Sequence, residues 1–136
     1  MLFRSGRDRA IVVKLTTHTP TNYLPGVPAY ALPYQGDQIT VLYDRVGQTV
    51  LPFAVPILLA HVLVHEITHI LQGIDRHAET GVVKAHWTPE DYRAMESKPL
   101  PFTPLDVQLI RLGLAPRVDP EARAMAPANS APKTTD

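Results

Sequence analysis

The sequence predicts an α+β fold in which a short mixed sheet with an edge strand lies over one long helix, and further helices follow towards the C-terminus. Three observations predict it. Short β-branched segments bounded by turn residues lie within residues 10–46, a long apolar segment occupies residues 50–72, and two later segments open with Thr-Pro and keep helical spacing. A chain of 136 residues suits one domain. We expect this domain to span residues 1–116.

Three segments are expected to form the sheet. Residues 10–15, AIVVKL, are short and rich in β-branched side chains. Residues 27–34, VPAYALPY, alternate, but Pro28 and Pro33 cannot donate to a central ladder, so this strand is predicted at the edge of the sheet. Residues 39–46, ITVLYDRV, give the clearest strand pattern, and the Gly-Gln-Thr that follows is expected to turn the chain.

The long helix is expected to begin between Pro52 and Pro56 and to end at Gln72. Proline suits the first turn of a helix, and Gly73 suits the position just after the end of one. Residues 74–87 show no period and are expected to be irregular.

Two shorter helices are expected beyond this segment. One begins at Thr88, where a threonine cap is followed by proline and acidic residues, and the other covers residues 102–114, with Gly113 near its end. After Pro116 the chain is rich in Ala, Pro and Thr, and no apolar period survives. Residues 117–136 are therefore predicted to be a disordered tail.

The composition argues against several classes of function. The 13 basic side chains balance the 13 acidic ones, so the chain has no bulk electrostatic attraction to nucleic acid or to an anionic membrane. No cysteine is present, which leaves His, Asp and Glu as the available metal ligands. The apolar run at residues 50–64 contains two prolines and is too short to span a bilayer comfortably.

The N-terminal residues are basic and lack the apolar core of a signal peptide. We expect a cytoplasmic protein if the chain starts at its own beginning, and a secreted or periplasmic one if an upstream segment is missing.

Four of the six histidines lie within residues 61–77, in an apolar setting. His65 and His69 are four residues apart, so on a helix they share one face and can bind one tetrahedral zinc ion. Glu66 follows the first of them and can take a proton from a water that the metal activates. The alternative is a pair of packed histidines with Glu66 at the surface, but unpaired His and Glu on an apolar helix would be costly. The HEITH pattern therefore predicts a zinc site.

His61 repeats the four-residue spacing but is not expected to bind the metal. It is eight residues from His69, about 12 Å along a helix axis. Zinc–nitrogen bonds are only about 2 Å long, so one ion cannot hold His61, His65 and His69 together. His61 is therefore predicted to pack in the core or to support the site.

A third ligand must come from beyond the helix. Gly73 lets the chain turn, and Asp75 and His77 follow it within reach. Histidine is the commoner zinc ligand, which favours His77. Asp75 stays open as the alternative, and Glu79 is a more distant one.

The segments HEITHILQGIDRH (65–77), GVVKAHW (81–87) and FTPLDVQLIRLGL (102–114) together resemble the metzincin-type zinc metallopeptidases. Residues 10–115 are similar to small bacterial metalloprotease-like proteins of that kind. The resemblance implies a zincin-like fold in which residues 27–34 form the edge strand that pairs with an extended substrate. It also implies that the next strand leads into the active-site helix.

Two positions depart from the pattern of that family. The family's count would place a glycine at Gln72 and the third ligand at Asp75, whereas the glycine of this chain comes one residue later, at Gly73. The methionine that lies beneath the metal in the family corresponds to Val83. The chain also starts near the family's second strand, which predicts either a minimal domain or a truncated N-terminus.

These residues predict zinc-dependent hydrolysis of a peptide bond in a peptide or protein substrate, with Glu66 as the general base. His86 and Tyr92 lie downstream and are candidates for stabilising the oxyanion, whereas Trp87 is expected to pack in the core. The first alternative is a non-catalytic, zinc-stabilised interaction domain, which Val83 and the short N-terminal region favour. The second is an intracellular regulatory zinc protease. Neither nucleic acid nor a membrane span is expected.

Overall fold

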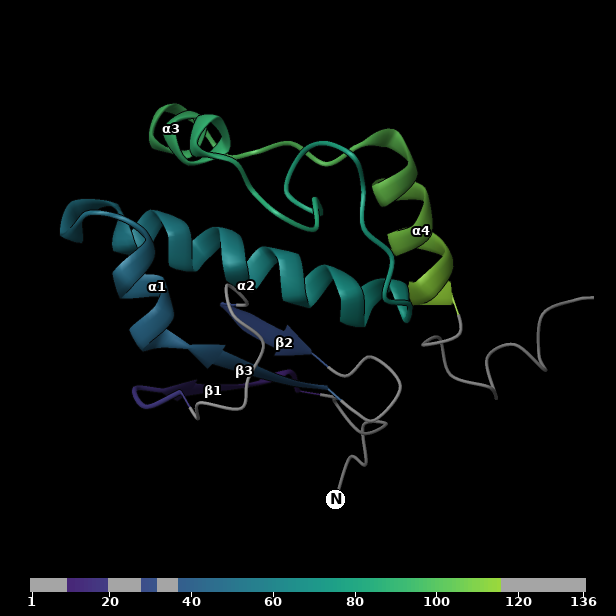
Figure 1. The fold of residues 1–136 in the computed structure, drawn as a ribbon. Helices are drawn as coiled ribbons and strands as arrows, with labels where there is room; N and C mark the ends of the chain where they lie inside the picture. The colour runs from purple at the N-terminus through teal and green to yellow at the C-terminus, as the bar shows by residue number, and fades with distance from the viewer. Residues whose placement is uncertain (1–9, 20–27, 32–36, 116–136) are drawn as a thin grey trace, which may run out of the picture.

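The computed structural model describes residues 10–19, 28–31 and 37–115 and is drawn in Figure 1. A long helix, α2 (Val55–Gln72), runs through the middle of the fold. A small sheet packs against one side of α2, and two shorter helices, described below, cover the other side (Figure 1). This layering confirms the predicted α+β class. The predicted tail beyond Pro116 lies outside the described residues.

The sheet has three strands, β1 (Val12–Thr16), β2 (Ala29–Ala31) and β3 (Gln38–Leu42), in the order β1-β3-β2. β1 runs parallel to β3 and β2 runs antiparallel to it, so the sheet is mixed, as predicted. Within the described residues β2 pairs only with β3, which confirms its predicted place at the edge. Pro28, just before β2, has no N–H to donate, but its carbonyl oxygen accepts the N–H of Leu42 at 2.8 Å.

The third predicted strand was expected to run to Val46, and this is wrong. The strand ends at Leu42, and a short helix, α1 (Tyr43–Thr49), replaces both its last residues and the expected Gly-Gln-Thr turn. Leu42 and Val46 are both buried, and their spacing of four residues fits one turn of a helix as well as it fits the core. Asp44, in the first turn of α1, accepts hydrogen bonds from the N–H and the hydroxyl of Thr19 and so ties the helix to the end of β1.

α2 ends where it was predicted to end. Its last residue is Gln72, and Gly73 adopts a left-handed conformation with φ of 69° while its N–H donates to the carbonyl of His69 at 2.8 Å. A residue with a Cβ would be strained in that conformation, so Gly73 releases the chain sideways from the helix axis. A single 3₁₀ turn, Pro52–Ala54, precedes α2, which agrees with the expected start among the prolines.

Most of the core lies between the sheet and α2, and Met95, from the first of the two shorter helices, adds to it from the other side of α2. Buried side chains of β3 meet buried side chains of α2, and the residues of this cluster are Ala29, Ile39, Val41, Val46, Leu58, Val62, Ile70 and Met95. By length and composition alone, the stretch Pro52–Gln72 could also cross a membrane, and 50% of an apolar 18-residue window within it is buried inside the fold. The core helix of a globular domain meets the same description, since it too is long and apolar.

Residues 74–88 contain no helix or strand, as predicted, and only an isolated bridge joins Ala78 to Lys84. α3 (Pro89–Ser97) and α4 (Pro104–Leu114) follow. Each begins with a capping box, in which a threonine hydroxyl accepts the N–H of an aspartate three residues later and the carboxylate accepts the threonine N–H. The Thr-Pro openings therefore predicted both helix starts correctly.

Gly113 lies near the end of a helix, as predicted, and it also has a role in packing. It lies inside α4, where the helix crosses the C-terminal end of α2. A Cβ at this position would collide with the backbone of Leu71 and Gln72. The glycine therefore allows the two helices to approach closely and fixes α4 on the end of α2.

Candidate metal centre

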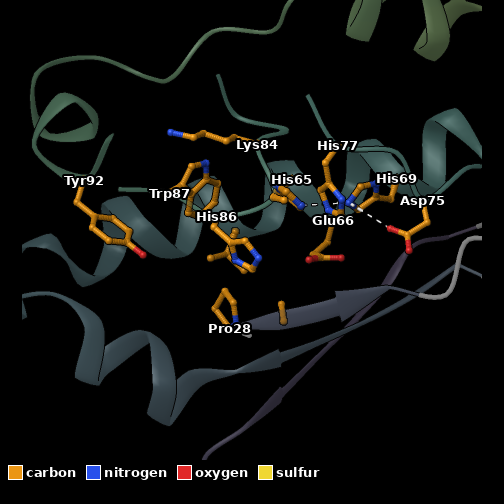
Figure 2. A pocket seen from close by; sticks show the side chains of 13 residues that line it. Pro28, His65, Glu66, His69, Asp75, His77, Lys84, His86, Trp87 and Tyr92 are labelled. Carbon is orange, nitrogen blue, oxygen red and sulfur yellow. Dashed lines mark hydrogen bonds and ion pairs between the residues drawn. The ribbon is translucent and has the colours of Figure 1, made fainter. Parts of the chain in front are cut away.

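Three histidines from two elements converge on one point. His65 and His69 lie on one face of α2, and His77 comes from the irregular segment after Gly73 (Figure 2). Each offers one ring nitrogen, and these three nitrogens lie within 4.8 Å of one another. Three histidine nitrogens at this spacing can hold a single metal ion.

His65 is oriented by the backbone of a distant residue. Its Nδ1 lies 2.8 Å from the carbonyl oxygen of Val82, and because a carbonyl can only accept, Nδ1 must carry the proton. Nε2 is then free of a proton and directs its lone pair towards His69. Burial lowers the pKa of His65 to about 4; the hydrogen bond to the Val82 carbonyl opposes this shift, and His69 and His77 make smaller contributions in the same direction as burial. The ring is therefore neutral near pH 7, which is the form that binds metals.

His69 presents its Nε2 to the Nε2 of His65 at 3.1 Å. Two ligands on a tetrahedral zinc ion stand about 3.3–3.4 Å apart when each bond is about 2.0–2.1 Å long, so the pair is already close to ligand geometry. Burial, followed by the proximity of His77, lowers the pKa of His69. Its Nδ1 is buried and makes no hydrogen bond of standard geometry to the described residues, although the backbone of Ile74 is near enough to favour the protonated ring.

His77 completes the cluster, whereas Asp75 lies at its edge. The ring centroid of His77 is 5.3 Å from that of His65 and 4.8 Å from that of His69. The carboxylate of Asp75 is 4.0 Å from Nε2 of His69, and its side chain is 72% exposed. The structure thus brings the favoured third residue to the helix pair and leaves the alternative nearby; which of them binds a metal stays a prediction. Glu79 is exposed and does not belong to the group.

Glu66 lies in a pocket beside the three rings. The pocket has a volume of about 490 Å³, and Figure 2 shows the Glu66 carboxylate next to the histidines within it. Only 8% of Glu66 is exposed. The alternative in which the histidines are merely packed expected Glu66 at the surface, and its burial disagrees with that alternative. A carboxylate held beside a three-histidine cluster is placed where a general base would be needed.

The predicted oxyanion residues line the same pocket. His86 and Tyr92 both border it, on the side away from His77 (Figure 2). Burial, and then the nearby Asp91, raise the pKa of Tyr92, so its hydroxyl keeps its proton at neutral pH. Trp87 was expected only to pack in the core. It does pack against the core, but it also lines the pocket and meets the ring of His65 edge-on with centroids 5.6 Å apart.

The first histidine of α2 was predicted not to bind the metal but to pack in the core or to support the site. His61 is buried and uses both ring nitrogens: Nδ1–H donates to the Ile57 carbonyl at 2.8 Å, and Nε2 accepts the N–H of Leu100 at 3.1 Å. It therefore has no nitrogen to offer a metal. Val83, which stands where the family has methionine, is fully buried in a small apolar cluster with Ala78.

Several residues of the pocket carried no signal in the sequence. Lys84 lines the pocket and forms an ion pair with Asp91 at 2.7 Å. Val82, which orients His65, acts through its backbone carbonyl, and no side-chain pattern reveals that. Residues 27–34 did carry a signal, because the metzincin resemblance implied that this edge strand lies beside a substrate, and Pro28 and Ala29 line the pocket.

Comparison of the chain with family models, with curated proteins and with solved structures finds no match. The function must therefore be inferred from the geometry of the site itself.

Proposed function

We propose that this chain is a zincin-like zinc metallopeptidase, in which His65, His69 and His77 hold one zinc ion and Glu66 is the general base. The observation that carries this proposal is the 3.1 Å separation of the two Nε2 atoms of His65 and His69, with the carboxylate of Glu66 beside them in an open pocket. The Nε2 lone pair of His65 faces Nε2 of His69 at this distance, and the neutral form of both rings can bind one cation through these two atoms.

The donor set fits zinc. Three imidazoles and an open side facing a pocket are typical of catalytic zinc sites, whereas structural sites close the ion off with a fourth protein ligand. Zinc supplies Lewis-acid chemistry, because it makes a nearby water more acidic and polarises a carbonyl group. The His65 ring is in the tautomer that a ligand needs, because the Val82 carbonyl holds the proton on Nδ1 and leaves Nε2 available to bind zinc.

Glu66 would perform the proton transfers of the reaction. It accepts a proton from the attacking water, whose oxygen forms a bond to the carbonyl carbon of the peptide. The same proton then passes to the leaving amine nitrogen as the C–N bond breaks. His86 and Tyr92 line the same pocket and carry groups that could donate a hydrogen bond to the oxyanion.

The edge strand suggests how a substrate would be held. β2 has a partner on one side only among the described residues, and its start lines the pocket through Pro28 and Ala29. An extended peptide could pair with the open edge and place its scissile bond near the histidines. This favours an unfolded or flexible protein segment as the substrate class.

A second candidate function is a non-catalytic, zinc-stabilised interaction domain. The observation that favours it is the carboxylate of Asp75, which lies 4.0 Å from Nε2 of His69 and could supply a fourth ligand. A fourth protein ligand would close the site to water. The absence of methionine at position 83 points in the same direction.

Zinc content and hydrolysis, measured on the same samples, test the two functions. We expect the chain, purified without chelators, to carry about one zinc ion and to cleave an unfolded protein substrate. Glu66→Gln should keep the zinc and lose the cleavage, because an amide cannot accept the proton. Zinc without cleavage in either protein would favour the interaction domain, and no zinc in the wild-type protein would refute both.

A further inference from the structure

His77 lies at the metal centre without a hydrogen bond to any described residue. Its side chain is exposed, and only ring contacts with the two helix histidines are seen there. A histidine on an irregular segment has many orientations open to it, and ordering it opposes binding. The placement of His77 must therefore come from the backbone on either side of it.

Both neighbours of His77 are fixed. On the N-terminal side, Nη1 of Arg76 donates to Oδ1 of Asp106 at 2.7 Å. On the C-terminal side, the N–H of Ala78 donates to the carbonyl of Val83 at 2.9 Å. Arg76 reaches to α4, whereas His77 next to it lines the pocket, so the ion pair sets which side of the segment faces the site.

Asp106 is the rigid end of this ion pair. It has no exposed surface, and its Oδ2 accepts the N–H of Thr103 at 2.7 Å in the capping box of α4. Its backbone carbonyl accepts from the side-chain amide of Gln72 at 3.2 Å. The other oxygen, Oδ1, accepts from Arg76. A buried carboxylate oxygen without a partner is costly, so this ion pair restricts the guanidinium of Arg76 to one position.

Asp106 is also held in a fixed position relative to His65 and His69. α4 is fixed on the end of α2 at Gly113, where its backbone lies against Leu71 and Gln72. Gln72 is three residues beyond His69 on the same helix, and its side chain bonds to Asp106. The position of Asp106 relative to the helix histidines is therefore set by direct contacts between the two helices.

We propose that the ion pair between Arg76 and Asp106 is a positioning device for the third ligand: it fixes the segment after Gly73 so that His77 meets His65 and His69. The inference rests on the proposed metal centre and adds to it two residues that do not touch the metal. The Asp106 side chain is fully buried and that of Arg76 is 28% exposed, and selecting one register of packing is the best attested use of buried polar or ionic groups.

Zinc affinity tests this role in a double-mutant cycle on the full chain. We expect Arg76→Met to weaken zinc binding, measured by chelator competition, about 10–100-fold, the usual effect of losing a group that orients a ligand. In a His77→Ala background the same substitution should change the affinity less than about 3-fold, because the residue it acts through is gone. Arg93→Met is the matched control, since Arg93 pairs with Glu90 on the surface, with side chains 73% and 78% exposed.

A second variant guards against simple unfolding. Arg76→Met leaves a buried carboxylate unpaired, so Arg76→Met combined with Asp106→Asn removes the charge as well and should show the same loss of zinc affinity. The proposal is overturned if this double variant, folded by circular dichroism, binds zinc as the wild type does. An equal loss in the presence and absence of His77 would also overturn it, because the ion pair would then act only on general stability.

Failure of the proposed function gives a different result. If the affinity pattern is as expected but no variant hydrolyses peptides, the positioning role stands and the catalytic proposal fails. If His65→Ala leaves zinc binding unchanged, the metal centre itself is wrong, and the role of Arg76 is refuted with it.

Discussion

The Nδ1–H of His65 donates to the carbonyl oxygen of Val82 at 2.8 Å, across 17 residues of sequence. The N–H of the same Val82 donates to the carbonyl of Pro101 at 3.0 Å. The backbone of Val82 is thus held in place by Pro101, in the linker between α3 and α4, and in turn orients the proposed ligand His65. Gly81, immediately before it, has a φ of 81°, and a Cβ there would collide with the Pro101 carbonyl.

Gly81→Ala should therefore disturb the metal centre without changing any proposed ligand. We expect it to lower the free energy of unfolding by about 1–3 kcal/mol, through left-handed strain and the displaced Val82. We also expect zinc affinity to fall about 10–100-fold, because the support of a ligand ring is moved. Denaturant unfolding of the metal-free protein and chelator competition measure the two effects.

Gly47→Ala is the matched control for this substitution. Gly47 lies in α1, and nothing stands within 4 Å of where its Cβ would be. Alanine in a helix is favoured over glycine by about 0.5–1 kcal/mol, so this variant should be slightly more stable and bind zinc normally. Equal zinc affinity in the Gly81 and Gly47 variants would contradict the role assigned to Val82.

Local patterns predicted the parts of this structure that depend on neighbouring residues. The spacing of His65 and His69 fixes their common face as soon as the segment is helical, and Gly73 ends that helix for a backbone reason. The third strand was predicted too long because Leu42 and Val46 are buried in either conformation, so their apolar character does not distinguish a strand from a helix.

Contacts between distant residues could not be predicted in the same way. Arg76 and Asp106 are 30 residues apart, and His61 meets Leu100 across 39 residues. The identity of a charged or polar residue does not reveal its partner, because most such residues are exposed to solvent. The grouping of His77 with the helix pair was predicted from chain reach and ligand frequency, whereas the anchor that holds its segment is visible only in three dimensions.

Zinc should stabilise the folded protein by an amount that rises with the logarithm of the zinc concentration once that concentration exceeds the Kd. An ion that binds only the folded state at 100 times its Kd adds about 2.7 kcal/mol to the free energy of unfolding. We expect this gain in the wild type and in Glu66→Gln, and we expect a chelator to reverse it. His65→Ala and His69→Ala should each lose it, which thermal unfolding with and without zinc would measure. Retention of the full gain by both alanine variants would show that the helix does not bind the metal.

The buried Asp106 predicts a specific loss of stability in acid. Burial raises its pKa, but the hydrogen bonds from Thr103 and Arg76 outweigh that effect and hold the pKa below the ordinary value of 3.8. A carboxyl group whose pKa is lower in the folded state stabilises the fold above its unfolded pKa, and this stability is lost as the pH falls below about 4. Asp106→Asn should cost about 1.5–3 kcal/mol at pH 6, the range for hydrogen bonds to charged groups.

The difference between wild type and Asp106→Asn should then shrink as the pH falls from 4 towards 2. Both proteins also lose stability below pH 6.5, because burial lowers the pKa of His65 to about 4 and the unfolded chain takes up that proton first. That loss is common to both proteins and cancels in the difference. Urea unfolding of the metal-free proteins across this range measures it, and a constant difference would mean that the carboxylate charge does not stabilise the fold.

The identity of the third ligand is the sharpest prediction from the site. His77 offers a nitrogen within 4.8 Å of the other two, whereas Asp75 is 72% exposed and approaches only His69, at 4.0 Å. We therefore expect His77→Ala to weaken zinc binding far more than Asp75→Ala, by at least about 10-fold relative to it. Competition titrations on both variants decide the question. A large loss for Asp75→Ala, with His77→Ala near wild type, would mean that the aspartate register implied by the metzincin resemblance holds, and that the segment rotates about Gly73 when the metal binds.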